Sequence, residues 1–156
     1  MIDWGSLARA IHILSVVVWI GGVSLVTTAL LPAMKGRPTE QWMREFDAAE
    51  RRFAPQARVA VLLVLLSGLY MLYAYDLWGR FVDPRFWWMH LMVAVWLVFA
   101  MLLFVVEPLT IRHARRKGRQ APSRAALTRL LWIHRVLLAL SLTAIFAAVG
   151  GSHGLF

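Results

Sequence analysis

Hydrophobic residues are gathered in long blocks, in contrast to the short alternations of a soluble helix or strand. Four apolar blocks cover about residues 6–31, 59–75, 86–106 and 127–149. At about 1.5 Å per residue, each block is long enough to cross about 30 Å of hydrocarbon as an α-helix, although the second only just reaches this length. The pattern predicts an all-α, integral membrane four-helix bundle that forms one transmembrane domain over 1–156.

Composition supports this interpretation and narrows the chemistry. Of the 156 residues, 60% are hydrophobic and 16% are charged, and the mean hydropathy is +0.65. Soluble domains carry about 25% charged residues, so this chain has too much apolar surface for one soluble core. Because the chain has no cysteine, disulfides, thiolate metal sites, iron–sulfur clusters and cysteine nucleophiles are excluded. The sequence also lacks phosphate loops, Gly-x-Ser-x-Gly and His-Glu-x-x-His motifs, which argues against hydrolytic chemistry.

Basic residues lie mainly in two of the segments between the blocks. The segment 35–58 carries six basic and four acidic residues, and 107–135 carries eight basic residues with one acidic residue. Because basic loops stay in the cytoplasm, both loops are predicted to be cytoplasmic and both termini outside, in a bacterial-type inner (cytoplasmic) membrane. The net charge of +9 then reflects orientation and attraction to membrane lipid, so no nucleic-acid partner is expected.

The first cytoplasmic loop contains an amphipathic segment. Trp42, Phe46, Ala49 and Phe53 recur at helical spacing among charged residues. Such a stripe is typical of a helix that lies in the membrane interface, and Pro55 is predicted to end it.

Three histidines, His12, His90 and His134, fall inside the predicted spans, where an ionisable group needs a partner or a function. His12 lies nine residues past Asp3 and His90 seven residues past Asp83, which places them at depths of about 13 and 10 Å on parallel helices. Two imidazoles at nearly one depth can hold the iron of one flat macrocycle. The spacing therefore predicts a haem b site with His12 and His90 as axial metal ligands.

Neighbouring residues fit such a cofactor. Arg9 is three residues before His12 and nearer the outer surface, where it could meet a haem propionate, while Trp19, Trp87 and Trp88 would form apolar walls. Small residues suit either close helix contact or space for a ring. They are Gly5, Ala8, Ser15, Gly21, Gly22, Ser67 and Gly68.

His134 and Arg135 enter the membrane from the cytoplasmic side. His134 could ligate a second haem, alone or with Met101, could bridge to a propionate with Arg135 beside it, or could pair with Glu107. The last two are preferred, because no second histidine within the membrane shares its level.

Two further histidines lie outside the spans. His113 is expected to face solvent in the second basic loop, before a helix start at Ser123, and His153 to lie in a disordered tail at the outer surface.

Several of these residues resemble the HemJ-type protoporphyrinogen oxidases and the related CopD-like membrane proteins over about residues 8–107. The matching positions are His12, Trp19, Gly21, Gly22, Glu50 to Phe53, Pro55, Ser67, Gly68, Trp88 and His90. The resemblance implies a compact helical bundle that carries haem b on His12 and His90. The HemJ-type pattern has a lysine two residues after the third-helix histidine, whereas this chain has Met92 at that position. A lysine ammonium could bind or protonate a tetrapyrrole intermediate, and a thioether cannot.

Three functions follow from these observations. The first is a haem b membrane redox protein, either an electron carrier or a haem-dependent oxidoreductase linked to quinol or an outer-face redox protein. The second is copper handling by a CopD-like protein, because thioethers and imidazoles suit Cu(I) and Met89, His90 and Met92 cluster. The third is a cofactor-free accessory subunit. Since four short helices offer little lateral area, a homo-oligomer is also expected.

Overall fold

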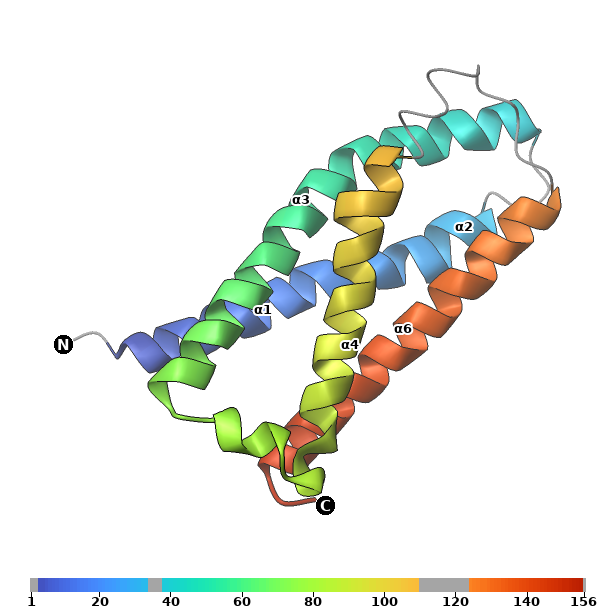
Figure 1. Ribbon diagram of the computed structural model, residues 1–156. Helices are drawn as coiled ribbons and strands as arrows, with labels where there is room; N and C mark the ends of the chain where they lie inside the picture. Colours follow the sequence, from blue (N-terminus) through green and yellow to red (C-terminus); the bar gives the residue numbers. More distant parts are fainter. Residues whose placement is uncertain (1–2, 34–37, 110–123, 156) are drawn as a thin grey trace.

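The computed structural model describes residues 3–33, 38–109 and 124–155 (Figure 1). These residues form no strand, and 92% of them are helical. The main helices are α1 (Trp4–Leu25), α3 (Thr39–Ala74), α4 (Trp87–Met101) and α6 (Arg124–Ser152). Four helical stretches are long and apolar enough to cross a membrane: Trp4–Ala33, Arg44–Ala74, Pro84–Leu109 and Thr128–Ser152. The predicted all-α, four-helix membrane architecture is confirmed.

Shorter helical elements extend or link the main helices. They are the π-helix η1 (Val26–Leu30), α2 (Leu31–Ala33), the 3₁₀ turns η2 (Trp78–Phe81) and η3 (Pro84–Phe86), and the π-helix η4 (Leu102–Val106).

Both π-helical turns come immediately before a proline. η1 ends two residues before Pro32 and η4 ends two residues before Pro108. A proline has no N–H for the carbonyl four residues earlier, and its ring pushes that carbonyl away. The helix therefore widens locally but does not break, so each π-helical turn remains part of its membrane span.

Pro55 behaves differently from the expectation. The amphipathic segment does not end there, because α3 runs without interruption from Thr39 to Ala74 and contains Pro55 in its interior. The helix bends along its length (Figure 1), which is how a long helix tolerates an internal proline. The interfacial segment and the second span are therefore one helix.

The four helices form a ring in which α1 packs mainly on α3 and α4 mainly on α6, with fewer contacts between α1 and α6 and between α3 and α4. Helices α1 and α4 are therefore diagonal neighbours. Both described ends of the chain lie at the same end of the bundle as the link between α3 and α4 (Figure 1). We call this end the terminal end, and we call the opposite end, where the basic segments join the helices, the basic end.

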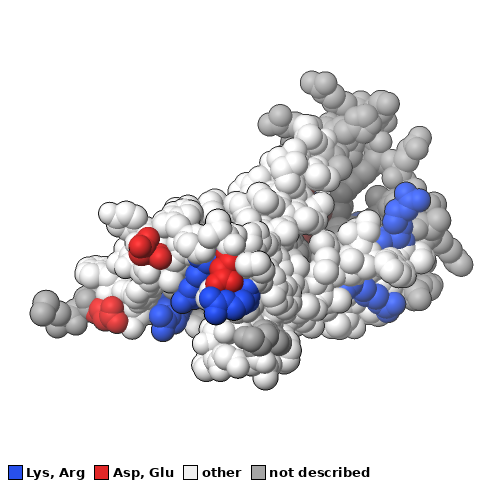
Figure 2. All heavy atoms as spheres, turned by 60° about the horizontal axis from the view of Figure 1, so that its bottom comes forward, with Lys and Arg blue, Asp and Glu red and all other residues white. Residues whose placement is uncertain are grey.

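Most side chains are apolar both on the inside of the ring and on the outside. The main core cluster contains Trp19 and Phe99, whose rings meet edge to face with centroids 4.9 Å apart. Large apolar side chains such as Leu14, Leu66 and Phe146 are more than 60% exposed. Figure 2 shows a broad uncharged surface between charged groups that lie toward the ends. An apolar exterior of this kind is expected of a protein surrounded by lipid.

The small residues of the first helix allow close approach by other side chains. A Cβ atom on Gly22 would lie 1.9 Å from the Phe53 ring, so the absence of a side chain there lets α3 pack on α1. Gly21 has nothing within 4 Å of the same position. Close helix contact, the simpler of the two expectations for these glycines, therefore accounts for Gly22.

Candidate functional site

His12 lies on the side of α1 that packs against α3. Its Nδ1 atom is 3.0 Å from the Ser67 hydroxyl oxygen, and its ring is in van der Waals reach of the position a side chain on Gly68 would occupy. The side chain is half-buried. The small residues Ser67 and Gly68 thus make room for an imidazole between two spans.

The hydrogen bonds of Ser67 indicate which ring nitrogen of His12 carries the proton. The single hydroxyl hydrogen of Ser67 is directed to the backbone of α3, with the carbonyls of Leu63 and Val64 as acceptors. The Ser67 oxygen is then free to accept from His12 Nδ1–H. In that tautomer of the neutral imidazole, Nε2 keeps its lone pair and can act as a metal ligand, with Ser67 fixing the ring.

His90 is exposed, and its ring meets the Phe81 ring edge to face, with centroids 5.4 Å apart. His90 lies nine residues before Phe99, which is about two and a half helical turns. The two side chains therefore leave opposite faces of α4, and Phe99 is the one that points to Trp19 of α1. The structure brings His12 to α3 and His90 to η2, so the pairing of these two histidines stays a prediction.

The contact between Trp19 and Phe99 sets the register of the two diagonal helices. His12 lies seven residues before Trp19 and Met92 seven residues before Phe99. Seven residues are about two turns, so each side chain lies on the same face of its own helix as the aromatic residue that follows it. Met92 is half-buried and packs against the main core cluster. Because α1 and α4 cross and diverge toward the terminal end (Figure 1), this shared offset does not by itself show a contact between His12 and Met92.

The methionines of α4 are further candidate metal ligands. Met89 is 8% exposed and belongs to a second cluster with Trp88 and Ala147 at the terminal end. Among residues 3–33, 38–109 and 124–155, no three His, Asp or Glu side chains converge as a metal site. Thioether and imidazole together are a donor set that favours Cu(I).

Two other predicted cofactor residues have protein contacts. The Arg9 guanidinium lies 5.8 Å from the centre of the Tyr75 ring, a cation–π arrangement at the terminal end. Trp19 is buried, and its Nε1 is the one buried side-chain N or O atom in the described segments without a hydrogen-bond partner. Its edge-to-face contact on Phe99 makes it a core residue.

The charged pair between α3 and the end of α4 was not foreseen. The Arg58 Nη2 atom lies 2.6 Å from Glu107 Oε1, with the side chains 33% and 14% exposed. Arg58 Nε also donates to the Leu103 carbonyl in the π-helical turn η4, at 3.3 Å. The sequence did contain a signal for this pair. Two opposite charges lie at the basic ends of neighbouring antiparallel spans, and a buried charge there needs a partner.

His134 forms its hydrogen bond within its own helix, and its predicted roles as a haem ligand or beside a propionate stay predictions. Its Nδ1 lies 2.9 Å from the Leu130 carbonyl one turn earlier in α6, while Glu107 forms its ion pair with Arg58. Arg135 lines a groove between α6 and α1. At the terminal end, His153 lies close to the Val149 carbonyl and the Ser152 hydroxyl, so the expected disordered tail is helical up to Ser152.

Two acidic residues at the terminal end have lowered pKa values. Hydrogen bonds from the Arg85 side chain, followed by its backbone N–H, lower the pKa of Asp83. A hydrogen bond from the Ser6 hydroxyl is the main cause of the lowered pKa of Asp3, which caps α1. These carboxylates therefore order the helix starts at this end.

Some expectations fall outside the described residues. They concern His113, the helix start at Ser123 and the side chain of Trp42.

A family model described as copper resistance protein D matches residues 47–150, which is 104 of the 156 residues. The chain belongs to this family. The comparisons with curated proteins and with solved structures gave no match. The resemblance to CopD-like proteins is therefore confirmed, and the match extends over α6, which the residue resemblance did not reach.

Membership of the copper resistance protein D family also bears on the site. The matched residues include Met89, His90 and Met92 of α4, whereas His12 of α1 lies before them. This family member is a multi-pass membrane protein by its four candidate spans.

Proposed function

We propose that this chain is a copper-handling membrane protein that binds Cu(I) as cargo inside the bundle, with His12 Nε2 and Met92 Sδ as ligands. The observation that supports the proposal is the hydrogen bond between His12 Nδ1 and Ser67, which leaves Nε2 available as a ligand, and Met92 is the thioether that has the same seven-residue offset from the Trp19 and Phe99 contact. Its copper chemistry is drawn from the family description.

The surroundings of the two side chains suit this ion. Cu(I) is a soft cation that accepts two or three ligands of the thioether and imidazole type. Ser67 holds the His12 ring and keeps the proton on Nδ1, so Nε2 is ready without loss of a proton. Met89, one turn before Met92 on the same helix, is a further thioether toward the terminal end.

The basic end indicates how the protein is oriented in the membrane. Both termini lie at the terminal end, and the basic segments adjoin the other end, so the positive-inside rule places the terminal end outside a bacterial-type inner membrane. Copper bound near His12 would then enter from the outer side. A homo-oligomer in this membrane is also part of the proposal.

The test is a Cu(I) titration of the whole purified chain against a chromogenic Cu(I) chelator. We expect His12→Ala and Met92→Leu each to weaken copper affinity about tenfold or more, since each removes one of few ligands. Met101→Leu, a change of an exposed methionine on the same helix, is the matched control and should leave the affinity within about twofold. Wild-type affinity in both His12→Ala and Met92→Leu would overturn the proposal.

A haem b site is the second candidate, because the same Ser67 hydrogen bond leaves His12 Nε2 suited to an axial iron position. Electron exchange with quinol or an outer-face redox protein belongs to this candidate. It requires His90 as the second ligand, whereas the copper site requires Met92. A pyridine haemochrome assay with metal analysis separates the two: iron lost in both His12→Ala and His90→Ala favours haem, and copper unaffected by His90→Ala favours the copper site.

A further inference from the structure

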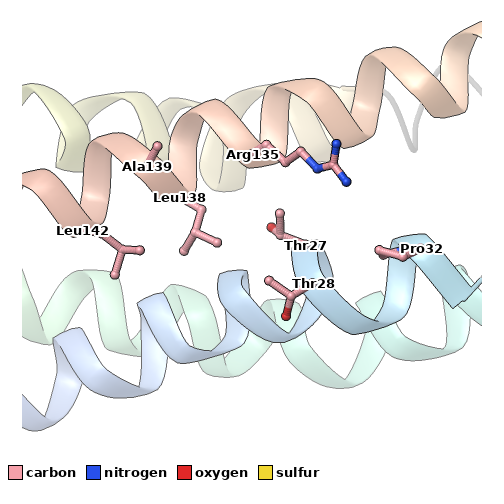
Figure 3. A pocket seen from close by; sticks show the side chains of 7 residues that line it. All are labelled: Thr27, Thr28, Pro32, Arg135, Leu138, Ala139 and Leu142. Atoms are coloured by element: carbon pink, nitrogen blue, oxygen red, sulfur yellow. The ribbon is translucent and has the colours of Figure 1, made fainter.

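We propose that the groove between the basic ends of α1 and α6 binds one anionic phospholipid, with Arg135 as the ligand of its phosphate. The groove has a volume of about 400 Å³. Its lining comes from two spans: Thr27, Thr28 and Pro32 of the α1 side, and Arg135, Leu138, Ala139 and Leu142 of α6 (Figure 3).

Arg135 carries the charge that selects the ligand. It lies seven residues inside the start of the fourth candidate span at Thr128, a depth of about 10 Å. Within the described residues, no ion pair or hydrogen bond to its guanidinium is found, although its side chain is exposed. A cation at this depth is costly without a partner, and a phosphate would provide two charge-assisted hydrogen bonds.

The direction of the side chain agrees with a headgroup ligand. In Figure 3 the Arg135 side chain extends toward the side of the groove that holds Pro32, which is the basic end. Long cationic side chains reach in this way for the headgroup layer. The phosphate of a lipid whose chains run along the groove would lie there.

The remaining lining suits an acyl chain better than a second polar group. The Thr27 hydroxyl donates to the Val23 carbonyl at 2.6 Å, and the Thr28 hydroxyl donates to the Ser24 carbonyl at 2.8 Å. Neither hydroxyl hydrogen is left for a phosphate. On the side away from Pro32, the groove continues along apolar side chains of α6, namely Leu138, Ala139 and Leu142 (Figure 3). A single cation above an apolar channel matches a phospholipid, whereas a free phosphate would need several donors.

The groove follows an irregular part of the first span. Thr27 and Thr28 belong to the π-helical turn η1, which ends two residues before Pro32. One wall of the groove therefore comes from a turn with π-helical geometry and from the proline that follows it.

The experiment is native mass spectrometry of the whole chain in detergent, titrated with phosphatidylglycerol or with phosphatidylcholine. We expect phosphatidylglycerol to be retained in preference, and Arg135→Gln to weaken that retention about tenfold while phosphatidylcholine is unchanged. Arg129→Gln removes an exposed arginine of the same helix that does not line the groove, and should change retention less than twofold. Circular dichroism of Arg135→Gln should match the wild type, which shows that the variant folds.

A second variant tests the apolar part. Ala139→Phe puts a ring into the groove and should lower retention of both lipids, while leaving Arg135 in place. The proposal is overturned if Arg135→Gln retains phosphatidylglycerol like the wild type, or if Arg129→Gln loses as much. Displacement of the lipid by millimolar inorganic phosphate would also overturn it, because the groove would then be a general anion site.

Discussion

The two ends of the bundle treat their polar groups in opposite ways. At the basic end, Arg58 and Glu107 neutralise each other, and Arg58 Nε donates to the Leu103 carbonyl. Toward the terminal end, Ser67 satisfies only one nitrogen of His12, and no charged group opposes it in the described structure. The comparison teaches that the charged pair has a structural role, whereas the neutral imidazole keeps a lone pair for a ligand.

The strongest way to break this comparison is to leave Arg58 without its partner. Glu107→Gln removes one charge of a half-buried pair and should lower the free energy of unfolding by about 3 kcal/mol, as measured by thermal unfolding in detergent. Arg58→Gln with Glu107→Gln removes both charges and should recover most of the loss. If the double variant were as destabilised as Glu107→Gln alone, the ion pair would not have this structural role.

A second change tests close packing near the same end. Gly22→Val would force Phe53 away from α1 and should lower the free energy of unfolding by about 2 kcal/mol. Gly21→Val is the matched control, because the added atoms meet open space and the β-branched change is the same. If both variants unfold alike in a thermal melt, the Phe53 contact contributes nothing.

A third change sharpens the other side of the comparison. Ser67→Ala removes the acceptor that orients His12 Nδ1–H but neither proposed copper ligand. We expect Cu(I) affinity to fall about tenfold, the low end of the range for outer-shell partners, with little loss of helicity. Ser67→Thr keeps the hydroxyl and should restore the affinity. Unchanged affinity in Ser67→Ala would show that the ring needs no such support.

The smallest effect is expected from the exposed ion pair at the terminal end. Because Arg85 lowers the pKa of Asp83, this carboxylate contributes stability at pH values above its ordinary pKa, and that contribution is lost as the pH falls through the lowered value. Asp83→Asn should therefore leave the melting temperature near neutral pH almost unchanged and flatten its decline below about pH 4. A large drop at neutral pH would contradict this weak surface role.

The length of the apolar blocks was sufficient to predict the four spans, because a membrane requires about 20 apolar residues per helix whatever the neighbours are. It was not sufficient for Pro55, where the sequence predicted a helix end. The bend in α3 keeps the chain helical on both sides of the proline, which a local rule about proline cannot foresee.

The candidate site divides in the same way. The sequence alone predicted that His12 and His90 lie at similar depth, because this prediction needs only the count of residues from each helix start. Which way the side chains face was decided by tertiary packing: the contact between Trp19 and Phe99 fixes the rotation of both helices, so that His12 meets Ser67 while His90 meets Phe81. Depth is a one-dimensional property of a span, whereas rotation is set by the side chains of its neighbours.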